Sequence, residues 1–262
     1  MSTPPRVSVI VPTVRVDDWL RAALQSLLAQ TAELEVVVVL DGVEDTTGMP
    51  RHECVRTVTL PQRSGSAAAI NAGAAVARGE FIGRLDADDL AEPGRVAAQV
   101  ALLDADPGIV AVGTAATVID DAGNTVGAID PPAGTDLARG LLRKNLVVHS
   151  SVLIRRSALV SVGGYDTRCV RMQDYDLWLR LARVGRVTNL PGRLTRYRVH
   201  ATMHSRETSP FSASATRIRA SRLALARHLG RSVPGQTLRN LAWTASQSAR
   251  HWGLRRPRFL TR

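Results

Sequence analysis

Residues 83–93 read GRLDADDLAEP, and they continue an apolar run that begins near residue 80. Three carboxylates, Asp86, Asp88 and Asp89, therefore stand within four positions at the end of an expected buried strand. Close carboxylates repel one another, which raises their pKa values unless a cation neutralises them. In an extended segment Asp86 and Asp88 point to the same side and face one target. The stretch predicts either a solvated polar turn or a site for a hard cation such as Mg²⁺ or Mn²⁺, and its residues alone leave both interpretations open.

Apolar, β-branched runs alternate with segments of helical spacing around this stretch. Strands are predicted over 7–11, 35–40, 55–60 and 80–85, and helices from Asp17–Asp18 to Leu28, over 66–77 and from Pro93 onward. This order is typical of an α/β fold whose parallel sheet is covered by helices on both faces. Ligands of such sheets bind at the carboxyl ends of the strands. Asp41 and the 86–89 cluster both follow strands, so we expect them on one rim of the sheet.

The second half of the chain has a looser pattern. Strands are predicted over 109–119, 149–154 and 194–199, with a turn at 120–124 and a helix over 134–144. Residues 173–184 predict an amphipathic helix that turns Leu177, Trp178 and Leu181 inward. Two further helices are predicted over 214–230 and 236–253, divided by Pro234.

The charge of the chain is unevenly distributed. Residues 1–205 carry equal numbers of acidic and basic residues, whereas residues 206–262 carry twelve arginines and one glutamate. A neutral body with a basic tail favours an enzyme with a surface-binding extension over a nucleic-acid-binding protein. No apolar run is long enough for a membrane span, the N-terminus lacks a signal-peptide layout, and Cys54 and Cys169 match no metal or redox spacing. A cytoplasmic protein is therefore expected.

The basic tail allows two interpretations. Its apolar positions with helical spacing are Ile218, Leu225 and Leu229 in the first segment, and Leu238, Leu241, Ala245 and Trp252 in the second. One interpretation is a basic amphipathic surface that lies on an anionic membrane, and this is the one we favour. The other is a pair of helices packed on the body with a solvated arginine face.

Phosphate-binding glycine loops are absent from the sequence. No G-x-x-x-x-G-K-S/T motif and no strand-linked G-x-G-x-x-G motif occurs, which argues against P-loop and dinucleotide-dependent enzymes. A sugar nucleotidyltransferase normally shows a glycine-rich loop with a lysine near its N-terminus, and residues 7–20 have neither. A metal must then neutralise any bound diphosphate.

Nine segments in order resemble the family 2 glycosyltransferases, which are inverting enzymes of the GT-A fold. The donor-half segments are VSVIVP (7–12), LQSLLAQT (24–31), VVLDGVED (38–45), GSAAAINA (65–72) and RGEFIGRLDADD (78–89). The acceptor-half segments are HSSV (149–152), VGGYD (162–166), QDYDLWLR (173–180) and NLPGRLTRYRVH (189–200). The resemblance covers about residues 5–205. It implies a GT-A catalytic domain over 1–205, divided near residue 115 into nucleotide-sugar and acceptor halves, and a basic helical extension over 206–262.

The resemblance also implies roles for single residues. Asp174 matches the catalytic base, and Asp86 and Asp88 match the D-x-D motif that contacts donor ribose and a Mn²⁺ or Mg²⁺ ion, with His200 as a further candidate ligand. The donor nucleotide is expected against Pro12, Thr13, Asp41, Asn71 and Asp86. The residues expected around the phosphates and the acceptor are His149, Gln173, Tyr197 and Arg198. The implied reaction transfers a sugar from a nucleoside diphosphate to a glycan or lipid-linked acceptor, in bacterial cell-surface polysaccharide or glycolipid synthesis.

Three positions depart from the common family pattern. Arg15 stands where the family commonly has Asn, Leu40 replaces the first Asp of a frequent pair, and Gln173 replaces a frequent Glu. None of these removes a core role, so we expect an active enzyme rather than a degenerate scaffold held at a membrane by the basic tail. Taken by itself, Asp174 is also a candidate helix N-cap worth about 1 kcal/mol.

Overall fold

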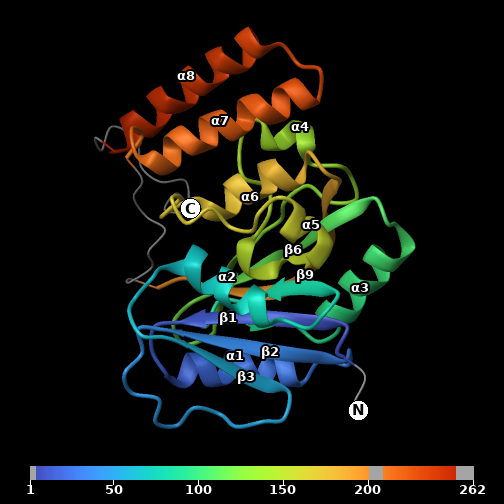
Figure 1. Cartoon of the computed structure of the whole chain (residues 1–262), viewed down its shortest axis with the longest axis vertical. Helices are drawn as coiled ribbons and strands as arrows, with labels where there is room; N and C mark the ends of the chain where they lie inside the picture. Colours follow the sequence, from blue (N-terminus) through green and yellow to red (C-terminus); the bar gives the residue numbers. More distant parts are fainter. Residues whose placement is uncertain (1–3, 201–208, 252–262) are drawn as a thin grey trace.

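The first half of the chain forms the parallel part of one sheet. The computed structural model describes residues 4–200 and 209–251. Strands β1 (Val7–Thr13), β2 (Leu34–Asp41), β3 (Val55–Leu60) and β4 (Phe81–Arg84) lie parallel in the order β3-β2-β1-β4. Helices α1 (Asp18–Leu28), α2 (Ser66–Val76) and α3 (Arg95–Ala105) connect them to one another and to the second half (Figure 1). The predicted elements between residues 7 and 105 are thus confirmed.

The alternation of side chains along β1 and β2 builds two separate cores. Val9, Val11 and Val38 pack with α1 and α3 on one face. Ile10 and Val39 point to the other face and pack with α2 and the acceptor-half helices. Because successive side chains of a strand point to opposite faces, a strand buried on both sides is apolar throughout, as β1 and β2 are.

The second half extends the sheet with strands of mixed direction. Strand β8 (Leu153–Arg155) is antiparallel to both neighbours, β4 and β6 (Ile109–Ile119), and β9 (Arg186–Arg198) lies parallel to β6. Strand β7 (Thr125–Ile129) pairs with β6, and the short β5 (Leu90–Ala91) pairs with β9. The sheet is therefore mostly, not wholly, parallel. The β5–β9 pair fixes the segment after Asp89 beside the end of β9.

Three predictions for the acceptor half are wrong in their bounds. Residues 149–154 form a 3₁₀ turn, η1 (His149–Ser151), before β8, because the Ser151 hydroxyl donates to the carbonyl of Val148 at 2.8 Å and tightens the chain. The helix expected over 134–144 is the single turn α4 (Ala138–Leu141). Strand β9 begins at Arg186 rather than residue 194, because register shifts opposite Thr114–Ala116 accommodate its Pro-Gly pair.

The remaining helices stack on the acceptor half. Helix α5 (Arg156–Ser161) follows β8, and α6 (Gln173–Leu181) turns Leu177, Trp178 and Leu181 inward as predicted. Helix α7 (Ala213–His228) packs on α6, and α8 (Val233–His251) lies outermost against α7 (Figure 1). Pro234 occupies the first turn of α8, which tolerates proline, and does not divide the helices as predicted. No helix in the described ranges is long and apolar enough to cross a membrane.

Candidate active site

The acidic cluster lies directly after β4, as the sequence predicts. Asp86, Asp88 and Asp89 offer carboxylate oxygens that all lie within 4.8 Å of one another. The Asp86 amide donates to the Ser150 hydroxyl at 2.8 Å, which ties the cluster to the 3₁₀ turn after residue 148. The three carboxylates are therefore held together by the fold and are not a loose surface turn.

The end of β9 closes one side of the cluster. Arg198 donates its amide to Asp89 Oδ1 at 2.7 Å and its Nε to the carbonyl of Asp88 at 2.8 Å. The His200 Nε2 lies 2.9 Å from Asp88 Oδ2, so two predicted site residues about 110 positions apart meet here. Trp19 of α1 packs on both the His200 ring and the Arg198 guanidinium, at 5.0 and 5.3 Å.

Burial and mutual repulsion raise the pKa values of two carboxyl groups in the cluster. Burial raises the pKa of Asp86, and the charges of Asp88 and Asp174 raise it further, against the opposing effect of Arg84. Burial and the two neighbouring carboxylates raise the pKa of Asp89 well above its ordinary value. Burial also raises the pKa of Tyr197, and the negative charges of the cluster and of Asp174 add to this effect. Asp174 therefore acts electrostatically on the same site as the cluster.

The acidic cluster fits a hard divalent cation. Mg²⁺ and Mn²⁺ take oxygen ligands, and they often keep one or two protein carboxylates beside substrate phosphates. The Asp89 Oδ2 atom is buried and has no hydrogen-bond partner within the described residues. Asp86 and Asp88 would hold the ion, and His200 lies in contact with one of these carboxylates.

A buried Arg84 connects the cluster to the acceptor half. Its guanidinium contacts Asp86 on one side and the His149 ring on the other. The His149 Nε2 lies 2.9 Å from the Tyr165 hydroxyl. Burial lowers the pKa of His149 well below its ordinary value of 6.5, and the Arg84 charge lowers it further, so the ring is neutral. His149, expected near the phosphates, is thus in the same polar network as the cluster.

Asp174 lies in the first turn of α6 and is not its N-cap. Met172 occupies the N-cap position with φ 56° and ψ 23°, and no side chain caps the helix there. The Asp174 Oδ2 instead accepts from the side-chain amide of Asn145 at 2.7 Å. Burial raises the pKa of the Asp174 carboxyl, against the opposing effect of its hydrogen bonds with the Tyr175 amide and Asn145. Gln173 precedes it as the first residue of the helix.

The expected nucleobase region lies at the ends of β1 and β2. Asp41 is buried and accepts from the amides of Ser64 and Gly65 at 2.6 and 2.9 Å. Gly42 follows with φ 68°, and a Cβ there would lie 2.7 Å from the backbone nitrogen of Arg63. This glycine allows the loop to close over the end of β2. In the neighbouring β1, Pro12 is half-buried and Thr13 is buried.

Asn71 links the donor half to the acceptor half through the backbone of Tyr165. Its side-chain Nδ2 donates to the Tyr165 carbonyl at 2.8 Å, and its Oδ1 accepts from the Tyr165 amide at 2.9 Å. The neighbouring Gly164 has φ 68°, and a Cβ there would lie 2.7 Å from Asn71 Oδ1. Asn71 therefore positions Tyr165, whose hydroxyl reaches His149.

Sequence reasoning missed Arg84, Asn145, Tyr165 and the buried Arg95 as site residues. Arg95 donates to the carbonyls of Ser150 and Arg84 at 3.1 and 2.7 Å, and burial lowers its pKa to about 10. An arginine at the end of the apolar run 80–85 was a usable signal for Arg84. No local pattern identifies Asn145, because its role depends on tertiary contact alone.

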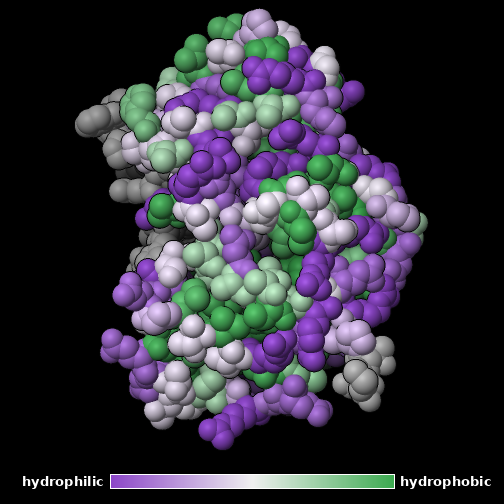
Figure 2. Space-filling model, in the orientation of Figure 1, coloured by the Kyte–Doolittle hydropathy of each residue, from purple (hydrophilic) through white to green (hydrophobic). Residues whose placement is uncertain are grey.

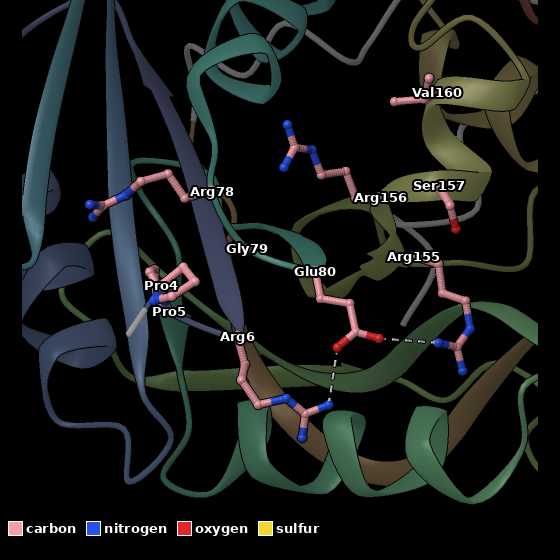
Figure 3. A pocket seen from close by; sticks show the side chains of 10 residues that line it. All are labelled: Pro4, Pro5, Arg6, Arg78, Gly79, Glu80, Arg155, Arg156, Ser157 and Val160. Carbon is pink, nitrogen blue, oxygen red and sulfur yellow. Dashed lines mark hydrogen bonds and ion pairs between the residues drawn. The ribbon is translucent and has the colours of Figure 1, made fainter. Parts of the chain in front are cut away.

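A second hollow lies at the opposite, amino end of the strands (Figure 3). Its volume of about 590 Å³ would accommodate a small ligand. However, Arg6 pairs with Glu80 at 3.3 Å, Arg155 pairs with the same Glu80 at 3.7 Å, and Arg78 pairs with Glu35 at 2.8 Å. Arg6, Arg78 and Arg155 at this end are therefore each paired with a carboxylate.

Comparison with known proteins agrees with this geometry. The sequence profile described as “Glycosyl transferase family 2” matches residues 8–163. The amylovoran biosynthesis glycosyltransferase AmsE of Erwinia amylovora is 29% identical over 199 residues, which cover 70% of this chain and 72% of AmsE. An uncharacterized glycosyltransferase of Haemophilus influenzae is also 29% identical, over 211 residues that cover 75% of this chain and 76% of its own.

Solved structures share the fold. The crystal structure of S. aureus TarS 1–349 in complex with UDP-GlcNAc superposes with a TM-score of 0.67 at 18% identity, covering 95% of this chain and 73% of TarS. This likeness concerns the fold alone, whereas the family profile spans more than half of the chain. The chain is therefore a member of glycosyl transferase family 2, a glycosyltransferase with the GT-A fold.

Proposed function

We propose that this glycosyltransferase is metal-dependent and inverting, and that it uses a nucleoside-diphosphate sugar. One observation carries the proposal: the fold gathers the three carboxylates of residues 86–89 beside a separate carboxylate, Asp174, whose charge raises the pKa of Asp86. The cluster has the oxygen ligands of a hard-cation site, and Asp174 stands apart from it on the acceptor-half helix α6.

The proposed transfer occurs in one displacement. The Asp174 carboxylate takes the proton of an acceptor hydroxyl while the hydroxyl oxygen attacks the anomeric carbon of the donor sugar. The new glycosidic bond forms as the bond from the anomeric carbon to the diphosphate oxygen breaks, and the electron pair leaves with the nucleoside diphosphate. Asn145 holds the Asp174 side chain through a 2.7 Å hydrogen bond to Oδ2. Attack from the face opposite the leaving group inverts the anomeric centre.

The donor phosphates are proposed to lie over the acidic cluster. Asp86 and Asp88 would hold a Mn²⁺ or Mg²⁺ ion there, which would supply positive charge to stabilise the departing diphosphate. Tyr197 and Arg198, which end β9, close the site from the acceptor side. His149, kept neutral beside Arg84, is placed to donate or accept a hydrogen bond without adding charge.

The donor nucleotide is proposed to be a uridine diphosphate. Pro12, Thr13 and Asp41 line the expected base region, and Asp41 still has lone pairs beyond its two backbone contacts. TarS, which shares the fold, has been solved with UDP and with UDP-GlcNAc. We propose the same nucleotide class here, with Asn71 setting the far wall of the donor site through Tyr165.

The proposed setting is the synthesis of a bacterial cell-surface polysaccharide or glycolipid. AmsE, one of the relatives, is named for amylovoran biosynthesis. The acceptor would be a glycan or a lipid-linked sugar, and the enzyme would work in the cytoplasm at the inner face of the membrane, with its basic C-terminal extension toward the lipid. The division of the chain near residues 115 and 205 remains part of this proposal.

A thermal-shift panel tests the function directly. UDP-, GDP-, dTDP- and CDP-sugars are each added with and without Mn²⁺, and ligand binding to the native state raises the unfolding temperature. We expect a shift with a UDP-sugar that needs Mn²⁺. Protein without any donor shift, and without transfer to any acceptor, would instead be a GT-A scaffold. A shift with another nucleotide would change the base assignment and retain the mechanism.

A further inference from the structure

Helix α8 turns apolar side chains toward solvent and buries polar ones against the protein. Its side toward α7 carries two buried polar residues, Gln236 (fully buried) and Asn240 (4% exposed), together with the partly buried Trp243. Its opposite side is apolar, and Leu238 and Leu241 are 67% and 61% exposed. At 100° per residue, these leucines share one face with Ala242 and Ala245, which are exposed as well. We call the four residues 238, 241, 242 and 245 the outer face of α8.

The inner contacts of the hairpin do not need this outer face. Gln236 donates to the carbonyl of Leu142 at 3.1 Å, and Asn240 donates to the carbonyl of Arg219 at 3.2 Å. Arg222, buried in α7, stacks on the Trp243 ring at 4.6 Å. On α7 itself, Ile218 and Leu225 are fully buried against the body. The packed-helix interpretation therefore holds for the first predicted helix of the tail, whereas α8 leaves its leucines in solvent.

Arginines without ion-pair partners among the described residues occur in α8, in the turn before it and at the end of α7. Among the described residues, the exposed Arg227, Arg231 and Arg239 make no ion pair. The sequence from 208 to 262 contains no Asp or Glu at all. Figure 2 shows hydrophobic side chains along the upper edge of the molecule, over α8, with hydrophilic ones beside them. Two copies that met through this face would bring like charges together, so its charge is complementary to an anionic surface and not to itself.

A further exposed apolar side chain lies at the start of the hairpin, near α8. Phe211, at the start of the hairpin, is 75% exposed. Arg219 donates to the carbonyl of the preceding Pro210 at 2.9 Å and to the hydroxyl of Thr244 in α8 at 3.3 Å. Phe211 is thereby held beside the C-terminal half of α8. Trp252, which the sequence pattern also assigns to the apolar face, lies outside the described residues.

We propose that the outer face of α8 lies flat on an anionic lipid bilayer, with Leu238 and Leu241 in the acyl boundary and the arginines at the headgroups. Interfacial helices combine exposed apolar side chains with basic neighbours in this way. The inference deepens the proposed membrane location of the enzyme and rests on it. It specifies one helix face, where the sequence alone offered the whole tail.

Vesicle binding by the full chain tests the proposal. Wild type is sedimented with phosphatidylcholine vesicles that contain or lack phosphatidylglycerol, and we expect binding only when the anionic lipid is present. Leu238→Gln combined with Leu241→Gln should weaken binding roughly tenfold or more, because two apolar side chains no longer leave water. Arg231→Gln combined with Arg239→Gln should also weaken binding and reduce its salt dependence. These side chains are exposed, so the variants should fold.

Matched controls separate the outer face from general effects. Val126→Gln removes another exposed aliphatic side chain, on β7, and Arg51→Gln with Arg183→Gln removes two exposed arginines elsewhere. These controls should bind vesicles as wild type does. The proposal is overturned if the leucine variant binds as well as wild type, or if wild type ignores anionic vesicles. It is also overturned if light scattering shows a wild-type dimer that the leucine substitutions dissociate.

The same samples keep this inference distinct from the proposed function. The Mn²⁺-dependent donor shift is measured on every variant, and the substitutions on α8 should leave it unchanged. If wild type shows the Mn²⁺-dependent donor shift but does not bind vesicles, only the proposed membrane contact of α8 is rejected. If wild type binds vesicles but shows no donor shift, the proposed metal-dependent transfer is rejected, whereas the membrane contact of α8 stands.

Discussion

The two ends of the parallel sheet have opposite arrangements of charge. At the amino end, Arg6 and Arg155 share Glu80, so that opposite charges face one another across the strand ends. At the carboxyl end, Asp86, Asp88 and Asp89 crowd within 4.8 Å. Burial raises the pKa of Asp86, and the charges of Asp88 and Asp174 raise it further, so that it stays raised although Arg84 lowers it. Paired charges are sufficient to explain the first end as structure, whereas the crowded carboxylates of the second end fit the proposed cation site.

The charged side chains at the two ends also differ in solvent exposure. The Arg6 and Glu80 side chains are 47% and 57% exposed, so water screens them and their pairing adds little to stability. Asp89 is 1% exposed, and its buried Oδ2 has no hydrogen-bond partner among residues 4–200 and 209–251. Burying like charges reduces stability, and proteins retain such arrangements mainly at functional sites. The carboxyl end is therefore where substitutions should change function most.

The largest effect is expected from Asp174→Asn. The amide keeps the size of the side chain but cannot accept the acceptor proton, so transfer should fall by about 10²–10⁴-fold or more. Donor binding in the thermal-shift assay should persist, which distinguishes loss of the base from loss of the site. Asp121→Asn, an exposed carboxylate on the same half of the chain, serves as the control. Unchanged turnover in Asp174→Asn would remove this residue from the mechanism.

The same residue predicts the pH dependence of turnover. The base works when deprotonated, and burial raises the pKa of Asp174 above its ordinary value of 3.8. The rate should therefore fall as the pH decreases through a value above 3.8, and stay level above it. A profile of kcat against pH at saturating donor measures this acid limb. A rate that stays level down to pH 4 would contradict the assignment.

The next largest effect is expected from Asp88→Ala at the metal cluster. Removing one ligand should abolish the Mn²⁺-dependent donor shift and weaken donor binding roughly 100-fold. Binding without metal should change little, because the nucleobase region lies on β1 and β2. Asp121→Ala, which also removes a carboxylate, should bind donor as wild type does. Equal donor affinity in wild type and Asp88→Ala would remove the metal assignment.

The fold was predictable where local pattern and tertiary pairing agree. Strand 109–119 was predicted with its observed bounds, because its apolar run is long and turns flank it. Segment 149–154 was not, because the Ser151 hydroxyl bonds to the backbone and replaces part of a strand with a 3₁₀ turn. The helices of the tail were located, but which of them exposes its leucines depends on contacts that periodicity does not contain.

The site was predictable only in part, for a similar reason. Asp86 and Asp88 were identified because both stand at a strand end, and their spacing alone places them on one side. Arg84 contacts Asp86 two positions away, and its place at the end of the apolar run was a local signal that went unused. Asn145 reaches Asp174 across 29 positions, so no local motif marks it. The N-cap alternative for Asp174 was wrong because Met172 takes that position with a left-handed backbone.

A smaller effect is expected when the neutral imidazole of His149 is replaced. The pKa of His149 in the folded state lies well below 6.5. Below pH 6.5, His149 is therefore protonated in the unfolded chain but stays neutral in the folded chain. Wild type should therefore lose about 1 kcal/mol of unfolding free energy between pH 7.5 and 5.5 from this group alone. His149→Asn should lose correspondingly less over that interval in urea titrations, whereas the exposed-residue control His52→Asn should behave as wild type. An equal pH slope in His149→Asn and wild type would contradict the buried, neutral ring.

The smallest effect is expected at the amino end, from Glu80→Gln. The substitution removes the shared partner of Arg6 and Arg155, and exposed ion pairs of this kind contribute about 0–1 kcal/mol. Urea unfolding should detect a loss within that range, while donor affinity and turnover should stay at wild-type values. The pair Glu80→Gln and Asp88→Ala then removes one carboxylate from each end of the same sheet. If Glu80→Gln weakens donor binding as Asp88→Ala does, charge pairing does not separate structure from function in this fold, and the arginine-lined hollow becomes part of the site.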